Sequence, residues 1–255
     1  MPLANQAFHY FQNWYREFGA LAVSLALPLS AWPEPVTLYA DIGTSTIGID
    51  RGEQISDTAV ELNLGADFAL EAGQLYVALY RLTPVGPYQS AYDDEVDYTA
   101  GFAWSGRGYE ADVSANWLTY PGEESEPSLE VAGAIALDLP LAPELAGFVD
   151  ADTNDRGLEL TAGPHWQAGN WEFDLRGRVG LVEPGGGGAS RSYAGIEGAA
   201  LYPLSRTVLL GTYIRAEWAD QDSFVRRYDN AGASSAFASQ SVAAGIVLAW
   251  TGQLK

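Results

Sequence analysis

The stretch from residue 107 to 139 constrains the fold of this chain more than any other part. Apolar residues alternate there with polar or small ones, on both sides of a Pro-Gly turn and an acidic loop. A period of two is that of a β-strand, whose successive side chains point to opposite faces of a sheet. Each run has about the 9–11 residues that a tilted strand needs to cross a bilayer, although a half-exposed soluble sheet alternates in the same way. The alternating apolar positions are Tyr109, Ala111, Val113, Ala115 and Trp117 before the turn, and Leu129, Val131, Gly133, Ile135 and Leu137 after it.

Composition helps to decide between a membrane-spanning sheet and a soluble one. The formal net charge is -20, with 33 acidic residues against 13 basic ones, which argues against nucleic acid and against adhesion to anionic lipid through a basic patch. The chain has no cysteine, so neither a disulfide framework nor a cysteine-based metal site is available. Hydrophobic residues make up 47%, yet no run after residue 31 approaches the ~18 apolar residues of a membrane helix. A closed amphipathic barrel is the membrane-spanning structure compatible with that combination.

Residues 1–31 are predicted to be a signal peptide or N-terminal leader, and residues 32–255 the barrel. An apolar core of secretory length runs from Phe18 to Ala31, with Pro28 near its end. The region before it is long and carries Arg16 as its one base. The alternative is a retained amphipathic or buried N-terminal helix.

After residue 35 the chain divides into about twelve alternating runs. The connections after every second run are tight, and the others are longer and more polar, among them GIDRGEQISD after the first run. Short turns at one end and long loops at the other are typical of outer-membrane barrels, with the short turns periplasmic. The sequence therefore predicts an all-β, transmembrane, antiparallel up-and-down β-barrel of about 12 strands in the bacterial outer membrane. Besides the two runs at 109–117 and 129–137, the expected strands are 36–44, 58–70, 74–82, 95–105, 144–150, 157–167, 171–181, 192–202, 207–218 and 239–250.

Tryptophan placement supports a membrane barrel independently of the turns. Each tryptophan after Trp32 stands at or near an end of a predicted strand, whereas a soluble core would more often bury tryptophan mid-strand. This distribution predicts two interfacial aromatic girdles, in contact with outer-membrane lipid. The girdle residues are Trp104, Trp117, Trp166, Trp171, Trp218 and Trp250, joined on the apolar faces by Tyr98, Tyr109 and Tyr202.

The run from Trp117 to Gly122, followed by a polar loop and the acid-bearing strand around Glu130, resembles the bacterial TorF-type porin family of conserved hypothetical outer-membrane proteins. The resemblance covers the first half of the barrel. It implies an outer-membrane pore and brings no catalytic residues with it. Contact with the outer-membrane assembly machinery is expected during biogenesis; many such barrels end on an aromatic residue that this machinery reads, whereas here Trp250 stands five residues before the end.

If the apolar faces meet lipid, the opposite faces line the interior. Acids are then expected on one wall and arginines on the other, which would create a transverse field across the lumen. Many inward positions are small and leave room for water, which favours a narrow, passive pore for small polar solutes with a preference for cations. Ion pairs that fill the lumen are the opposing possibility, and would make a non-conducting barrel whose acidic extracellular loops bind a partner, divalent cations or lipid headgroups. The predicted pore-lining residues are Glu61, Asp67, Asp97, Glu110, Asp112, Glu130, Asp138, Arg176, Arg178 and Arg215.

Metal binding and catalysis have little support in the sequence, and no cofactor is expected. Asp150, Asp152 and Asn154 begin like a calcium loop, but Asp155 stands where the loop needs glycine and Thr161 where it needs glutamate. An EF-hand is therefore rejected, and a looser divalent-cation site remains a weak candidate. His165 is the one histidine after the leader and has no serine within two residues, so an enzyme is not expected.

Overall fold

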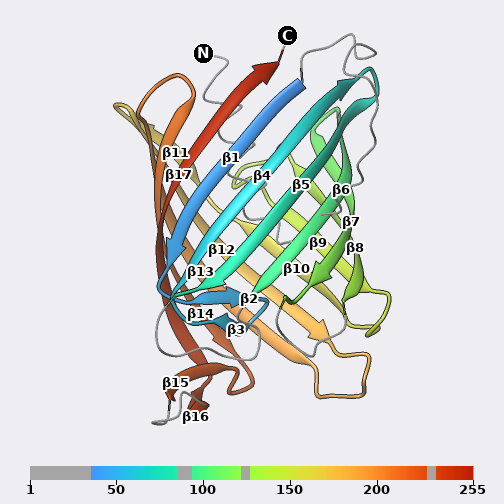
Figure 1. Cartoon of the computed structure of the whole chain (residues 1–255), viewed down its shortest axis with the longest axis vertical. Helices are drawn as coiled ribbons and strands as arrows, with labels where there is room; N and C mark the ends of the chain where they lie inside the picture. The colour runs from blue at the N-terminus through green and yellow to red at the C-terminus, as the bar shows by residue number, and fades with distance from the viewer. Residues whose placement is uncertain (1–35, 86–93, 122–126, 229–233, 255) are drawn as a thin grey trace.

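The computed structural model describes residues 36–85, 94–121, 127–228 and 234–254, and the predicted leader lies outside them. These residues form one closed antiparallel barrel of 12 strands, one of which is interrupted and therefore carries two labels (Figure 1). Within this part of the chain, no helix is long and apolar enough to span a membrane. The barrel strands are β1 (Val36–Ser45), β4 (Ala59–Leu70), β5 (Gly73–Pro84), β6 (Glu95–Gly106), β7 (Tyr109–Thr119), β8 (Ser128–Leu137), β9 (Glu144–Asp150), β10 (Arg156–Ala162), β11 (His165–Ala168), β12 (Trp171–Glu183), β13 (Arg191–Pro203), β14 (Val208–Ala219) and β17 (Gln240–Leu254).

Two pairings close the barrel. The first barrel strand, β1, pairs with the last, β17, so that Val36 lies opposite Leu254. β10 pairs with β9 on one side and with β12 on the other, which completes the ring of neighbours. The start of β1 and the end of β17 therefore lie at the same end of the barrel, the one that carries the short turns (Figure 1). We call this end the turn end, and the opposite end, with the long connections, the loop end.

The exterior of the barrel is apolar. Large hydrophobic side chains on its outward face are half exposed or more, as at Ile42 (53%), Val179 (54%), Ile214 (59%) and Val242 (59%). The charged residues that alternate with such positions point inward, and Asp97 and Glu217 are fully buried. An apolar exterior around a charged interior is the arrangement that a lipid environment requires. The chain is therefore a transmembrane β-barrel of the bacterial outer-membrane type, as the sequence predicts.

The tryptophans lie at the two rims of this apolar band. Trp166 and Trp171 stack on Phe173 at 5.4 and 6.3 Å between ring centroids, and Trp171 also meets Tyr202 at 5.0 Å. This aromatic group stands on the outside at the turn end. At the loop end, Trp218 donates its indole N–H to Gln240 at 2.8 Å. Trp and Tyr prefer these rims because one part of each ring is apolar and another forms hydrogen bonds.

Inside the barrel, four tyrosines each lie over a glycine on the neighbouring strand. A Cβ atom added at Gly65 would stand 2.1 Å from the Tyr39 ring. Each pair occupies directly opposite positions in the strand register. A ring that lies flat in the space left by a missing side chain covers the glycine and keeps the wall thin. The pairs are Tyr39–Gly65, Tyr76–Gly101, Tyr193–Gly180 and Tyr213–Gly245.

The structure differs from the predicted strands in two places. The expected strand 157–167 is broken between β10 and β11, because Pro164 has no N–H for the ladder and Gly163 approaches the Leu175 carbonyl too closely for a side chain. The last strand continues past Trp250 to Leu254. Two loops also contain hairpins that the alternation does not predict: β2 (Gly48–Asp50) with β3 (Glu53–Ser56), and β15 (Phe224–Tyr228) with β16 (Ser234–Ala238).

Candidate functional site: the barrel lumen

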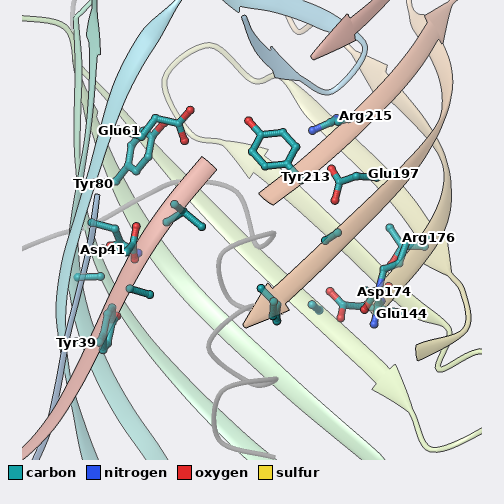
Figure 2. A pocket seen from close by; sticks show the side chains of 18 of the residues that line it. Tyr39, Asp41, Glu61, Tyr80, Glu144, Asp174, Arg176, Glu197, Tyr213 and Arg215 are labelled. Carbon is teal, nitrogen blue, oxygen red and sulfur yellow. The ribbon is translucent and has the colours of Figure 1, made fainter. Parts of the chain in front are cut away.

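The inward faces of the strands enclose a cavity of about 570 Å³, which we call the lumen cavity. Its lining runs from the turn end, at Ser205 and Arg206, to the β2–β3 hairpin, at Ile49 and Arg51. Figure 2 shows two facing walls. Tyr39, Asp41, Glu61 and Tyr80 come from β1, β4 and β5, and Glu144, Asp174, Arg176, Glu197, Tyr213 and Arg215 come from β9 and β12 to β14.

Most of the residues predicted to line a pore are in the interior, but not all of them reach the lumen cavity. Asp97 and Glu130 are buried at the loop end, 0% and 2% exposed, and do not border the cavity. Glu110 lies on the same face of β7 as Asp112 but also does not border it. The residues that do line it are Glu61, Asp67, Asp112, Arg176, Arg178 and Arg215.

The prediction for Asp138 is wrong. β8 ends at Leu137, and Asp138 lies exposed in the turn that leads to β9. Its backbone N–H donates to the Gly108 carbonyl at 3.0 Å, a contact between neighbouring turns. Alternation assigns a face only while the strand continues, and here the strand ends one residue before Asp138.

The wall that carries Arg176, Arg178 and Arg215 is not positively charged. Arg176 and Arg215 do lie across the lumen from Asp41 and Glu61 (Figure 2), but each arginine of this wall has acidic partners on its own side. Arg176 pairs with Asp174 at 3.3 Å, and Arg178 stands 3.6 Å from both Glu159 and Glu197. Arg215 pairs with Glu217 at 2.6 Å. The expected transverse field is therefore weakened, and the lumen cavity is lined by nine carboxylates against five arginines.

The connection between β1 and β4 folds into the barrel, and we call residues 46–58 the inner hairpin. β2 and β3 pair with each other around Arg51 and Gly52, which have positive φ angles of 44° and 80°. Two successive positive φ angles define the type I′ turn that tight hairpins favour. A side chain at position 52 would also collide with Tyr193, since its Cβ would stand 2.7 Å from the tyrosine Cβ. Figure 1 shows this hairpin lying across the loop end of the barrel.

The tip of the inner hairpin is bound to the opposite wall through charged groups. Arg51 donates from Nη1 and Nη2 to the two carboxylate oxygens of Glu130 on β8, at 2.7 and 3.1 Å. Its guanidinium also lies 3.5 Å from the centroid of the Phe148 ring on β9. The Gly52 N–H donates to Glu217 on β14 at 2.8 Å, and Arg191 on β13 donates to the Arg51 carbonyl at 3.0 Å. These distances are those of charge-assisted hydrogen bonds, which are the stronger ones in proteins.

An apolar cluster holds the body of the inner hairpin. Ile49 packs with Val182, Tyr193 and Ala243 from the barrel wall. Phe224, from the loop after β14, is fully buried in the same cluster. The Gln54 N–H donates to the Ser223 carbonyl at 3.2 Å, which joins the hairpin to that loop. The loop end of the lumen is thus filled by packed side chains where the sequence predicts an open pore mouth.

Negative charge gathers around the inner hairpin. Burial raises the pKa of the Tyr120 hydroxyl, just beyond the end of β7, and Glu95, Asp97 and Asp50, which lie near this hydroxyl, raise its pKa further than burial alone does. The guanidinium of Arg51 stands within this group, beside the Asp50 carboxylate at 3.7 Å. Much of the predicted acidic loop region, 86–93 and 122–126, lies outside the described residues.

Asp150, Asp152 and Asn154, the weak candidates for a metal site, belong to a hydrogen-bonded turn. Asp150 accepts the N–H groups of Asp152 and Thr153, both at 2.8 Å. Asp152 accepts the N–H of Leu129 at 2.8 Å, which ties the turn to β8. Within the stretches that the structure describes, no group of three or more His, Asp or Glu side chains is placed to hold a metal ion.

The inner hairpin is the functional feature that sequence reasoning missed. The sequence places this segment among the longer, more polar connections, which are expected to be external loops. A signal is nevertheless present, since Ile49 and Ile55 flank an Asp-Arg-Gly turn, a pattern typical of a hairpin with one apolar face. His165, the one histidine after the predicted leader, lines the lumen cavity and lies opposite Asp174 in the strand register.

Comparison with known proteins finds similar solved structures but no similar sequence. No protein-family model matches the sequence, and no curated protein matches it. Among solved structures, the NanC porin is 8% identical, with 84% of this chain and 98% of the porin covered and a TM-score of 0.48. LpxR from Salmonella typhimurium is 11% identical over 84% of this chain and 99% of its own, with a TM-score of 0.48. OmpT, an outer membrane protein of Vibrio cholerae, is 7% identical over 85% and 97%, with a TM-score of 0.39. The barrel assignment itself rests on the strand pairing and not on these similarities.

Proposed function

We propose that this chain is an outer-membrane channel for the passive diffusion of small polar solutes, with a preference for cations. The observation that carries the proposal is the lumen cavity of about 570 Å³, bounded by polar side chains from both walls of a closed barrel. Alanines such as Ala78, Ala132 and Ala134 line it alongside the charged groups, and small side chains leave room for water. Rings of acidic side chains favour cations in pores. The resemblance to the TorF-type porin family is kept as part of this proposal.

The direct test is electrical. Refolded protein is inserted into planar bilayers, and current is recorded in symmetric potassium chloride and then in a salt gradient. We expect discrete current steps and a reversal potential of the sign that cation preference gives. Absence of steps from correctly folded protein, with the inner hairpin intact and with it weakened, would refute the channel. A reversal potential of the opposite sign would refute the cation preference alone.

A non-conducting barrel is the second candidate, and the inner hairpin is the observation that favours it. A segment that is bound to β8, β13 and β14 by charged groups obstructs the loop end of the lumen. In that case the acidic loop end would bind a partner, divalent cations or lipid headgroups. Protein that is folded by heat-modifiable gel mobility, yet carries no current with the hairpin intact or weakened, would support this candidate.

We propose no catalytic role. His165 lies opposite Asp174 across β11 and β12, and both residues line the lumen cavity. A histidine beside a carboxylate does not by itself define a hydrolytic site.

A further inference from the structure

We infer that the inner hairpin is a releasable plug, which occupies the loop end of the lumen and leaves it when the charged contacts at its tip break. The inference rests on the proposed channel function, since a plug has meaning only in a barrel that conducts. It assigns residues 46–58 as the gate and Arg51 as the residue that holds it closed.

The strand pairing shows that the hairpin can move without opening the barrel. β2 and β3 form a two-stranded sheet of their own and are not part of the 13-stranded sheet that makes the wall. The hairpin is fastened at its base, where the Thr46 N–H donates to Ala244 at 2.9 Å and the Thr58 hydroxyl donates to Thr46 at 3.1 Å. A rotation about this base would leave every ladder bond of the barrel in place.

The charged contacts that resist such a rotation lie mainly at the tip, while the apolar cluster around Ile49 resists it along the body of the hairpin. Arg51 joins β8 through Glu130, and the Gly52 N–H joins β14 through Glu217. Glu53, next in the chain, pairs with Arg191 of β13 at 2.7 Å. Three consecutive hairpin residues therefore bind three strands of the barrel through charged partners.

Arg51 has the central position among these contacts. Its guanidinium holds Glu130 with two hydrogen bonds and lies on the Phe148 ring, while its carbonyl oxygen accepts from Arg191. The Glu130 carboxylate is 3% exposed, so it has little water to replace the arginine. Removal of the Arg51 side chain would leave that carboxylate buried without its cation and would favour a state in which the hairpin no longer seals it from water.

The release arm of the test compares Arg51→Ala with wild type in planar bilayers. The control is Arg156→Ala, which removes an arginine from an exposed ion pair with Glu183 of the same 2.7 Å length that includes no hairpin residue. Heat-modifiable mobility on gels confirms that each variant is folded. We expect Arg51→Ala to raise the mean current several-fold, by larger or more frequent openings, and the control to match wild type. Equal currents in all three would overturn the gate.

The locking arm uses the absence of cysteine from the chain. Gln54 and Ser223 lie on neighbouring backbones, joined by a hydrogen bond of 3.2 Å from the Gln54 N–H to the Ser223 carbonyl, and a disulfide requires two backbones that lie this close together. Ser223 is a firm anchor because its loop is tied to β13, where Asp220 and Ser192 exchange hydrogen bonds of 2.9 Å. In the Gln54→Cys, Ser223→Cys double variant, we expect oxidation to suppress the openings and a reductant to restore them.

The two arms separate the gate from the channel. If no variant conducts, the proposed channel function fails and the plug fails with it. If wild type conducts but neither Arg51→Ala nor a disulfide verified by mass spectrometry changes the current, the channel stands and the hairpin is a fixed constriction. Should the disulfide not form, the release arm alone decides.

Discussion

The guanidinium of Arg51 and the carboxylate of Glu130 meet inside the barrel through two hydrogen bonds, at 2.7 and 3.1 Å. Arg51 belongs to the connection between β1 and β4, whereas Glu130 belongs to β8, several strands away around the ring. Asn116 on β7 donates to the same carboxylate at 3.1 Å and fixes its position. This pair therefore determines both the shape of the loop end and the charge that a solute meets there.

The pair should be strongly coupled in stability. Arg51→Ala leaves the Glu130 carboxylate buried and unpaired, and removal of one partner of a buried pair costs about 3–5 kcal/mol. We expect the double variant with Glu130→Ala to cost less than the sum of the single variants by about 0.5–3 kcal/mol. Urea unfolding in lipid vesicles measures all four free energies of the cycle. The exposed pair Arg156–Glu183 serves as comparison, and its cycle should give a coupling of about 0–1 kcal/mol; equal couplings for the two pairs would contradict the assignment.

The tyrosine–glycine pairs lead to a second prediction. A methyl group at Gly65 would stand 2.1 Å from the Tyr39 ring, so Gly65→Ala must displace that ring or the wall behind it. Overpacking of this kind costs about 1–3 kcal/mol. Gly177→Ala is the matched control on β12, because its nearest neighbour would be 3.9 Å away. The urea midpoint of unfolding should fall for Gly65→Ala and stay at the wild-type value for Gly177→Ala. Adding Tyr39→Ala to Gly65→Ala should partly restore the midpoint. A wild-type midpoint for Gly65→Ala would refute the packing argument.

The barrel itself was predictable from local pattern. The period-two alternation, the parity of the turns and the tryptophans at strand ends all depend on residues close in sequence. The inner hairpin was not predictable in the same way. The conformation of its turn is encoded locally by Arg51 and Gly52, but its inward direction depends on Glu130 and Glu217, about 80 and 165 residues further along the chain.

The errors at the site have physical causes of the same kind. Asp138 was assigned to the interior by parity, but parity has no meaning once the strand has ended at Leu137. Arg176, Arg178 and Arg215 line the lumen cavity, but the ion pairs that the sequence leaves open as the opposing possibility form there and weaken the expected transverse field. Arg178 is neutralised by Glu159 and Glu197 from the adjacent strands β10 and β13, and only the register reveals that they are neighbours.

Ion selectivity should show which acidic residues face the lumen, those that line the cavity in the structure or Asp138, which the sequence placed there. Asp41 and Glu61 both line the lumen cavity, whereas Asp138 lies in an exposed turn. We expect Asp41→Asn combined with Glu61→Gln to reduce the cation preference, because two negative charges leave the lining. The reversal potential in a potassium chloride gradient should move toward zero for this variant and stay unchanged for Asp138→Asn. A larger shift for Asp138→Asn than for the lumen variant would show that the turn, not the wall, carries selectivity.

The position of the aromatic rims can be measured in lipid. Trp171 is 40% exposed on the outside at the turn end, stacks on Phe173 and meets the Tyr202 ring at a tilt. An interfacial tryptophan lies near the lipid headgroups, so bromine atoms high on the acyl chains should quench its fluorescence more than bromines near the bilayer centre. Subtracting the emission of Trp171→Phe from that of wild type isolates this one residue from the other tryptophans. Stronger quenching of the difference by the deep bromines would place Trp171 in the hydrocarbon core and would shift the whole barrel along the membrane normal, which would also move the lumen cavity relative to the bilayer.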